Sequence, residues 1–371
     1  MILAVSAAAS AAQAQTPSFE LDGRLLLDYA EQDVRSADPA VDSETVVDRY
    51  VRGARLRVDG ELTERLSFRV EADVRDGGPQ VNFTDAYLAY QATDEVTLRL
   101  GNFRTFSIEA LTSLNDITFM NRGAYSDFVQ ADRTTAAEAV FTRGPWRLSA
   151  AAISDSINEA DDDADSRGWV ARAVFAPDIE GADSLHLAVW ARGRESGPLT
   201  YRYGVRSNAN IGDRLTDAGR FESDRTLGLE AAVLRGPVTV QAEYARVAVE
   251  PVGGGGDGKG VGWYLSASWF PTGDRRVYED GEIDGVEVLR PVTDGGFGAV
   301  ELAIRRDAVD LSDLPPSPRP RAGRYEAWTV GATWWLTGYT RLMANYTDAN
   351  NAAPGGLVEA DTFQVRAQYS F

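Results

Sequence analysis

Residues Asp361 to Phe371 read D-T-F-Q-V-R-A-Q-Y-S-F, and this segment carries the clearest sign of the fold. Successive side chains of a β-strand point to opposite faces, and here the two faces differ in chemistry. One face carries Phe363, Val365, Ala367, Tyr369 and Phe371, and the other carries Thr362, Gln364, Arg366, Gln368 and Ser370. Such a strand, ending on an aromatic residue, is typical of a transmembrane β-barrel with its apolar face toward lipid. An edge strand of a soluble sandwich is the alternative.

The same alternation recurs along almost the whole chain. It predicts an all-β protein, a 16-stranded antiparallel transmembrane β-barrel, with no helix except a short turn near residues 109–114. The sixteen predicted strands cover residues 19–29, 47–60, 64–75, 82–90, 95–103, 135–142, 146–153, 167–176, 183–194, 222–234, 238–249, 260–270, 296–306, 324–336, 339–347 and 362–371.

The connections between these strands alternate between short and long, as the turns and outer loops of outer-membrane barrels do. Short ones include R-G-P at 143–145 and T-G at 337–338, and long ones include 104–134 and 348–361. One connection, 271–295, is long where the alternation predicts a short turn. A sandwich would not keep this alternation over so many hairpins, so the barrel is favoured.

Composition excludes several classes of function. The 371 residues include no cysteine and one histidine, His186, so we expect neither a metal site nor a cofactor. The formal net charge of −19 argues against a nucleic-acid partner, which needs a basic face. The basic residues are 36 arginines and one lysine, Lys259.

The N-terminus reads MILAVSAAASAAQAQ, which resembles the apolar region and cleavage site of a signal peptide without its basic start. We expect residues 1–14 to be a truncated signal peptide and residues 15–371 to be one barrel domain. A random alanine-rich tail is the alternative.

Alternation also predicts which side chains face the lumen. The arginines expected there include Arg24, Arg55, Arg57, Arg69 and Arg99. Carboxylates such as Glu71 and Asp73 share that face, so we expect a lumen of mixed charge. Most of the negative charge falls in the long loops, for example at residues 160–165.

The segment from Leu100 to Arg122, L-G-N-F-R-T-F-S-I-E-A-L-T-S-L-N-D-I-T-F-M-N-R, resembles the third-loop region of the phosphate-selective porin O and P family. The stretches 269–278 and 295–305, which flank the long connection, also resemble that family, as does D-A-Y-L at 85–88. The resemblance implies a trimeric porin of the Gram-negative bacterial outer membrane. Its third loop would fold into the pore, and anions would pass arginine ladders and a lysine cluster at the constriction.

The chain departs from the family pattern at that constriction. Arg104 stands where the resemblance implies a lysine, Thr105 replaces a proline, and Asn121 replaces an acidic residue. We therefore expect a weak to moderate anion preference rather than a dedicated phosphate channel.

Four residues near the third loop are the candidates for the constriction and anion site: Arg104, Glu109, Arg122 and Arg133. A guanidinium group stays charged and pairs bidentately with phosphate or carboxylate. The alternative is that these arginines pair with Glu109, Asp116 and Asp132 and attach the loop to the barrel wall.

The leading hypothesis is a passive outer-membrane porin, not an enzyme, that lets small hydrophilic solutes such as phosphate or other small anions diffuse. A structural or adhesive barrel and a barrel-embedded enzyme are the alternatives. Expected partners are outer-membrane lipids, lipopolysaccharide and two further copies in a homotrimer. The barrel-assembly machinery would recognise Tyr369 and Phe371.

Overall fold

The computed structural model of the chain describes residues 17–74, 81–158, 166–177, 179, 183–196, 201–251, 257–314 and 322–371. The expected signal peptide and the acidic run at 160–165 lie outside these residues. No helix in the described part of the chain is long and apolar enough to cross a membrane.

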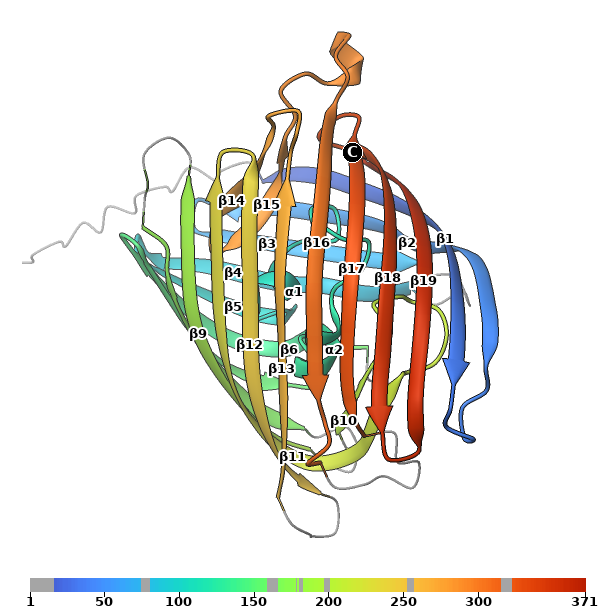
Figure 1. The fold of residues 1–371 in the computed structure, drawn as a ribbon. Coiled ribbons are helices and arrows are strands. Elements are labelled where there is room, and N and C mark those ends of the chain that lie inside the picture. Colours follow the sequence, from blue (N-terminus) through green and yellow to red (C-terminus); the bar gives the residue numbers. More distant parts are fainter. Residues whose placement is uncertain are drawn as a thin grey trace, which may run out of the picture.

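Sixteen antiparallel strands form a closed barrel, because the first strand pairs with both the second and the last (Figure 1). The barrel strands are β1 (Ser18–Ser36), β2 (Glu44–Thr63), β3 (Leu66–Val74), β4 (Val81–Thr93), β5 (Val96–Phe103), β6 (Thr134–Arg143), β7 (Trp146–Ser154), β8 (Arg167–Phe175), β9 (Ser184–Glu195), β11 (Thr216–Arg235), β12 (Val238–Pro251), β13 (Gly258–Trp269), β16 (Ala299–Asp310), β17 (Arg324–Trp335), β18 (Thr340–Ala353) and β19 (Gly356–Ser370). The predicted barrel and all sixteen of its strands are confirmed.

The prediction of a long loop at 348–361 was wrong. Strands β18 and β19 continue pairing up to Ala353 and Gly356, which leaves a two-residue turn between them. The ends of these strands carry polar residues on both faces, for example Asn350 and Asn351. Apolar alternation marks only the part of a strand that borders lipid, so it missed the part that extends beyond.

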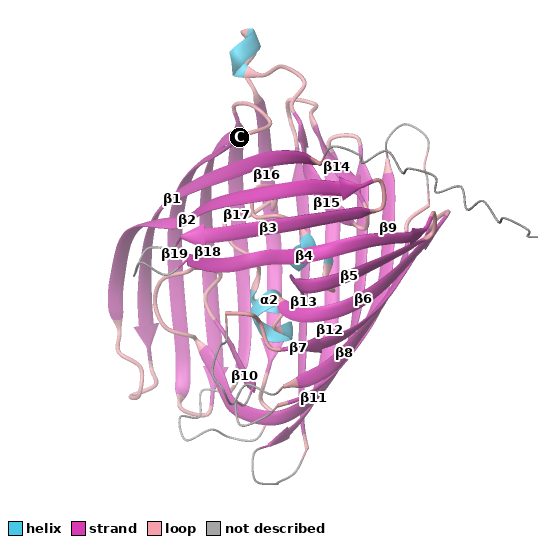
Figure 2. Cartoon of the chain, turned by 180° about the vertical axis from the view of Figure 1, so that it is seen from behind, coloured by secondary structure: helices cyan, strands magenta, loops and turns pink. Residues whose placement is uncertain are grey.

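The barrel wall is uneven in height. Strands β3 and β5–β8 have eight to ten residues, and we call them the short wall. Strands β9, β11–β13 and β16–β19 have 12 to 20 residues and form the long wall. The two views in Figures 1 and 2 show these walls on opposite sides of the barrel.

The outer face is apolar, as the sequence predicted, and exposed leucine, valine, phenylalanine and tryptophan side chains cover it. At the C-terminus, the backbone N–H groups of Gly23 and Phe371 each donate to the other residue's carbonyl at 3.0 Å. The Phe371 ring is half exposed and covers Gly23, where a Cβ would lie 2.3 Å from the ring. The last residue therefore extends the seam between β1 and β19.

Three segments fill part of the barrel interior. The third loop (residues 104–133) contains α1 (Ile108–Leu111) and α2 (Ala124–Val129), and a later loop contains β10 (Tyr201–Val205). The long connection at 271–295 forms a hairpin of β14 (Arg275–Glu279) and β15 (Glu282–Glu287), followed by the 3-10 turn η2 (Val292–Asp294). Figure 2 shows α2 within the barrel, behind the strands of the short wall.

Wall arginines hold the third loop by its backbone. Arg192, Arg341 and Arg366, from β9, β18 and β19, donate to the carbonyls of Val129 (2.7 Å), Ile117 (2.9 Å) and Met120 (2.6 Å). Among the described residues, no following turn of helix and no neighbouring strand donates to these carbonyls, so the N–H groups of the buried guanidiniums do. The loop therefore spans the lumen from the β9 side to the β19 side.

Side chains of the third loop and the wall fill the side of the lumen next to the long wall. Phe106 of the third loop lies against Trp190, with ring centroids 4.3 Å apart, and Tyr125 lies 5.5 Å from Tyr264. The hairpin β14–β15 packs nearer to the end of the barrel that carries the C-terminus (Figure 1), where the Tyr278 hydroxyl lies 2.7 Å from Nδ1 of His186. The open path through the barrel is consequently displaced toward β1–β8.

A candidate pore lined by arginine

Two cavities lie along this open side of the lumen. The outer cavity, of about 620 Å³, lies toward the long loops and is bounded by the third loop, β6–β9 and residues 201–214. The inner cavity, of about 530 Å³, lies toward the short turns and is bounded by β1–β5 and the β14–β15 hairpin. Together they mark a path from one end of the barrel to the other.

Five residues line both cavities and so mark the passage between them: Arg52, Arg104, Leu114, Arg122 and Arg133. We call the four arginines the constriction ring. Three of its members, Arg104, Arg122 and Arg133, are constriction candidates from the sequence, and the structure brings them together.

Two members of the ring bond only to neutral oxygens among the described residues. Arg104 donates from Nε to the carbonyl of Ala131 at 2.8 Å. Arg122 donates to the carbonyls of Glu109 (3.0 Å), Ala110 (3.0 Å) and Thr112 (2.6 Å), at the C-terminal end of α1. Both guanidinium groups fix the loop and still present positive charge to the passage.

Burial lowers the pKa of Arg122 to about 10, which leaves the group charged at neutral pH. Burial, and then the neighbouring guanidinium of Arg133, lower the pKa of Arg104. A small anion in the passage would raise the pKa of both arginines again, because its negative charge favours the charged guanidinium groups.

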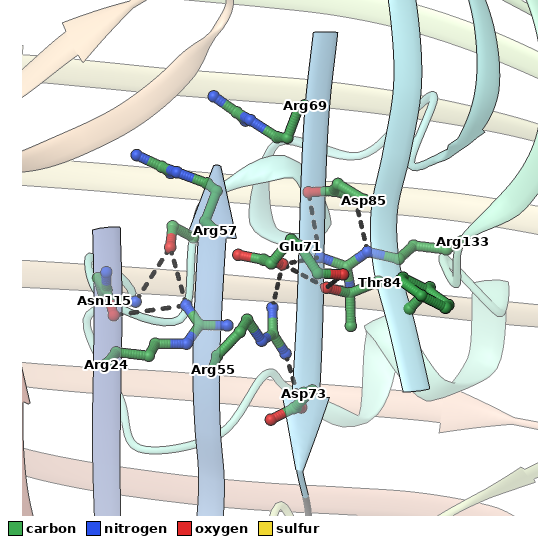
Figure 3. Close-up of polar contacts among 12 residues, drawn as sticks. Arg24, Arg55, Arg57, Arg69, Glu71, Asp73, Thr84, Asp85, Asn115 and Arg133 are labelled. Atoms are coloured by element: carbon green, nitrogen blue, oxygen red, sulfur yellow. Dashed lines mark hydrogen bonds and ion pairs between the residues drawn. The ribbon is translucent and has the colours of Figure 1, made fainter. Parts of the chain in front are cut away.

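Arg133 is bound differently, as part of an ion-pair network on the wall (Figure 3). Its Nε and Nη2 donate to the two carboxylate oxygens of Asp85, at 2.7 and 3.3 Å, and Nη2 also reaches Glu71 at 3.3 Å. Arg55 bridges Glu71 (2.6 Å) and Asp73 (3.0 Å). The network holds Arg133 rigidly at the edge of the passage.

The other lumen arginines predicted from the sequence line the inner cavity. Arg57 and Arg69 share the carboxylate of Asp59, at 2.9 and 2.6 Å, and Arg99 pairs with Glu138 at 2.5 Å. Arg24 instead donates to the hydroxyl of Ser113 and the amide oxygen of Asn115, at 3.2 and 3.4 Å (Figure 3). The wall is therefore a ladder of mostly compensated arginines.

Glu109 lies behind the lining of both cavities. Its carboxylate accepts hydrogen bonds from the backbone N–H of Gly123 (3.0 Å), the hydroxyl of Ser126 (2.7 Å) and Nη1 of Arg305 (3.0 Å). Through these bonds Glu109 joins the two helices of the third loop to β16.

Arg52 was missed because strict alternation places it on the lipid face. The pairing of β1 with β2 shifts at this point, so that Leu26 lies opposite Gly53 and Leu27 lies opposite Val51. Arg52 is the extra residue of this β-bulge, and bulges redirect side chains. Nothing in the sequence R-Y-V-R-G-A-R at 49–55 indicates this bulge.

The two cavities differ in charge. Ten arginines and three aspartates line the outer cavity. Nine arginines line the inner cavity, together with eight carboxylates. Four of those carboxylates come from the β14–β15 hairpin: Glu279, Asp280, Glu282 and Asp284. The described residues contain no group of three or more histidine, cysteine or acidic side chains placed to hold a metal ion.

A closed 16-stranded barrel with a polar path through it is the architecture of a diffusion porin. The chain belongs to the family of phosphate-selective porins O and P, whose sequence model matches residues 19–371. It is 26% identical to porin O of Pseudomonas aeruginosa, over 95% of this chain and 88% of the relative. It is 29% identical to an uncharacterised protein of Caulobacter vibrioides, over 91% of this chain and 70% of the relative.

Solved structures share the fold at lower identity. An anion-selective porin from Comamonas acidovorans superposes with a TM-score of 0.60 at 17% identity, over 96% of this chain and 100% of that one. The trimer form of OmpT, an outer-membrane protein of Vibrio cholerae, gives 0.57 at 12% identity, over 96% and 100%.

The family establishes a porin of the Gram-negative outer membrane, through which small hydrophilic solutes diffuse passively. The C-terminus, the turns at 143–145 and 337–338 and the long connection 271–295 therefore face the periplasm. The third loop enters the barrel from the opposite, exterior end, where the two-residue turn between β18 and β19 also lies. The inner cavity opens to the periplasm and the outer cavity to the exterior.

Proposed function

We propose that this porin prefers small anions, without dedicated specificity for phosphate. The observation that carries the proposal is the lining of the outer cavity, with ten arginines against three aspartates. Four of these ten arginines form the constriction ring, which the inner cavity shares. An anion entering from the exterior meets positive charge along this route.

The net charge of −19 does not oppose this preference. Charges more than about 8 Å apart in water at physiological salt are screened from each other. A solute in the passage therefore responds to the arginines around it, and responds little to carboxylates in the exterior loops.

The lining also limits the specificity. Both cavities are lined without a lysine, and the chain's single lysine lies on β13 with its side chain outside the lumen. Some N–H groups of Arg104 and Arg122 already donate hydrogen bonds to backbone carbonyls. The remaining N–H donors attract small anions in general, because they do not surround the four oxygens of a phosphate in particular.

The same proposal includes a homotrimer and a non-enzymatic role. The trimer form of OmpT with the same fold, together with the short wall, supports trimer formation through β3 and β5–β8. His186 supports a structural role, because its Nδ1 and Nε2 contact Tyr278 (2.7 Å) and Glu230 (3.1 Å) and so tie the periplasmic hairpin to the wall. Outer-membrane lipid, lipopolysaccharide and the barrel-assembly machinery complete the proposed partners.

Reconstitution in a planar bilayer with a potassium chloride gradient tests the preference. The reversal potential is expected to have the sign of net chloride permeation, with a chloride-to-potassium permeability ratio of a few-fold. A cation-selective pore would overturn the proposal. A tenfold or greater preference for phosphate over chloride would contradict the absence of phosphate specificity.

A further inference from the structure

A third concavity lies outside the lumen, on the outer face of the long wall. It has a volume of about 520 Å³ and is lined by residues of β12, β13, β16 and β17 near their exterior ends. It shares no residue with the two pore cavities. We call it the outer-wall concavity.

Strand register arranges its side chains in two rows. The row nearer to the exterior runs across four strands: Arg246 on β12, Val261 on β13, Asp310 on β16 and Arg324 on β17, each opposite the next. Lys259 stands one step further toward the exterior, next to Ala248. The rise of a strand places successive rows about 7 Å apart. The lining holds three basic residues, Arg246, Lys259 and Arg324, and three acidic ones, Asp310, Asp313 and Glu326. The acids lie on β16, β17 and the residues that follow β16, so the positive charge of Arg246 and Lys259 remains on the β12–β13 side of the concavity.

The next row toward the periplasm is aromatic and apolar on β12, β13 and β16. There Tyr244 lies opposite Trp263, and Trp263 lies opposite Ala308. The row ends on β17 with Glu326, opposite Ala308. On the periplasmic side of this row, Arg306 lies on the outer face between Leu265 and Trp328 and pairs with Glu326. Apart from this ion pair the outer face of these strands is apolar, with Val240, Ile304 and Val330, down to Trp269 near the periplasmic end. Aromatic residues mark the two edges of the lipid-facing band in such barrels. The basic edge therefore lies at the level of the lipid headgroups of the outer leaflet.

Two of the cations at this edge are available to a ligand. Arg324 pairs with Asp310 at 2.9 Å, and Arg306, just below, pairs with Glu326. Arg246 and Lys259 are exposed, and neither pairs with a carboxylate among the described residues. An ammonium and a guanidinium group side by side suit a phosphate group, since both donate charge-assisted hydrogen bonds to its oxygens.

We propose that the outer-wall concavity binds the phosphorylated headgroup of lipopolysaccharide, with Arg246 and Lys259 on the phosphate. Tyr244 and Trp263 would lie against the upper part of the acyl chains. A glycolipid fits better than a neighbouring subunit, because the long wall lies opposite the short wall and a subunit contact would bury two uncompensated cations. The proposal rests on the outer-membrane location and is independent of the pore's ion preference.

The test measures lipid binding to the purified protein in detergent by native mass spectrometry. The probes are lipopolysaccharide and the same material after enzymatic removal of its phosphates. The variant Arg246→Ala/Lys259→Ala is expected to bind the phosphorylated probe about thirtyfold more weakly, at about 1 kcal/mol for each basic residue at a membrane surface. The matched control is Arg35→Ala/Arg49→Ala, which removes two exposed arginines from the exterior ends of β1 and β2 and should bind normally.

Single-channel conductance of each variant shows whether its barrel is intact, and we expect it unchanged. Equal binding by the double variant and the control would overturn the proposal, as would equal binding of the wild-type protein to the dephosphorylated probe. A change of oligomeric state in the double variant alone would also overturn it, in favour of a subunit interface. None of these results bears on the anion preference.

Discussion

Arg104 shows what a single residue contributes to the pore. Its guanidinium group lies in the passage between the two cavities and bonds to one backbone carbonyl. A unit charge acts on an ion about 5 Å away in water with about 0.8 kcal/mol, so Arg104→Ala should lower the anion-to-cation permeability ratio by about fourfold or more. The reversal potential in a salt gradient measures this change.

Arg104→Lys is the matched control, because it keeps the charge. Replacing the acids of residues 160–165, which lie outside the described residues, should move the reversal potential much less. A larger effect of those loop acids than of Arg104→Ala would show that the constriction lies elsewhere.

The candidate site was partly predictable at this scale. Arg104 and Arg122 were found because they flank a loop whose motif resembles a known family. Their carbonyl partners, the ion pairs of Arg133 and the position of Arg52 were not found, because each depends on a contact between segments far apart in sequence or on one bulge. The sequence predicted Glu109 near the anion path because of its position in the third loop. In the structure its carboxylate forms an ion pair with Arg305.

At the scale of elements, alternation located every barrel strand because lipid on one side and water on the other require it. It did not find β10 or the β14–β15 hairpin, since short strands inside the lumen have no lipid face. The unusual length of the connection 271–295 was the one visible sign of the hairpin. Its position follows from contacts such as the one between Arg276 and Glu301, at 2.8 Å.

The closing strand β19 yields a prediction of its own. Deleting Phe371 removes the reciprocal hydrogen bonds with Gly23 and uncovers that glycine at the seam. We expect a severalfold lower yield of folded, heat-modifiable protein in the outer membrane, measured by electrophoresis of unheated samples. Phe363→Ala, an equally exposed position on the same strand, should lower the yield less. Wild-type yield after the deletion would remove the assembly role of the last residue.

At the scale of the whole molecule, the pore is electrically asymmetric. The exterior cavity is strongly positive, whereas carboxylates of the periplasmic hairpin and wall nearly balance the arginines of the inner cavity. A conducting path must attract a solute and also release it. The acids at the periplasmic end would weaken the hold on an anion that has passed the constriction ring, and so they favour its release.

This asymmetry predicts a pH dependence that acts from the periplasmic side. Burial raises the pKa of Glu282 on the hairpin to about 7 and that of Asp116 in the third loop to about 6. A raised pKa means that each carboxylate loses its negative charge as the pH falls from about 8 to about 5. The inner cavity then becomes more positive, so anion selectivity should increase, and the increase should be largest when only the periplasmic side is acidified. Glu282→Gln should show the higher selectivity already at about pH 8 and about half the remaining pH response. A selectivity that falls on acidification, or is unchanged in this variant, would show that the hairpin acids do not act on the permeating ion.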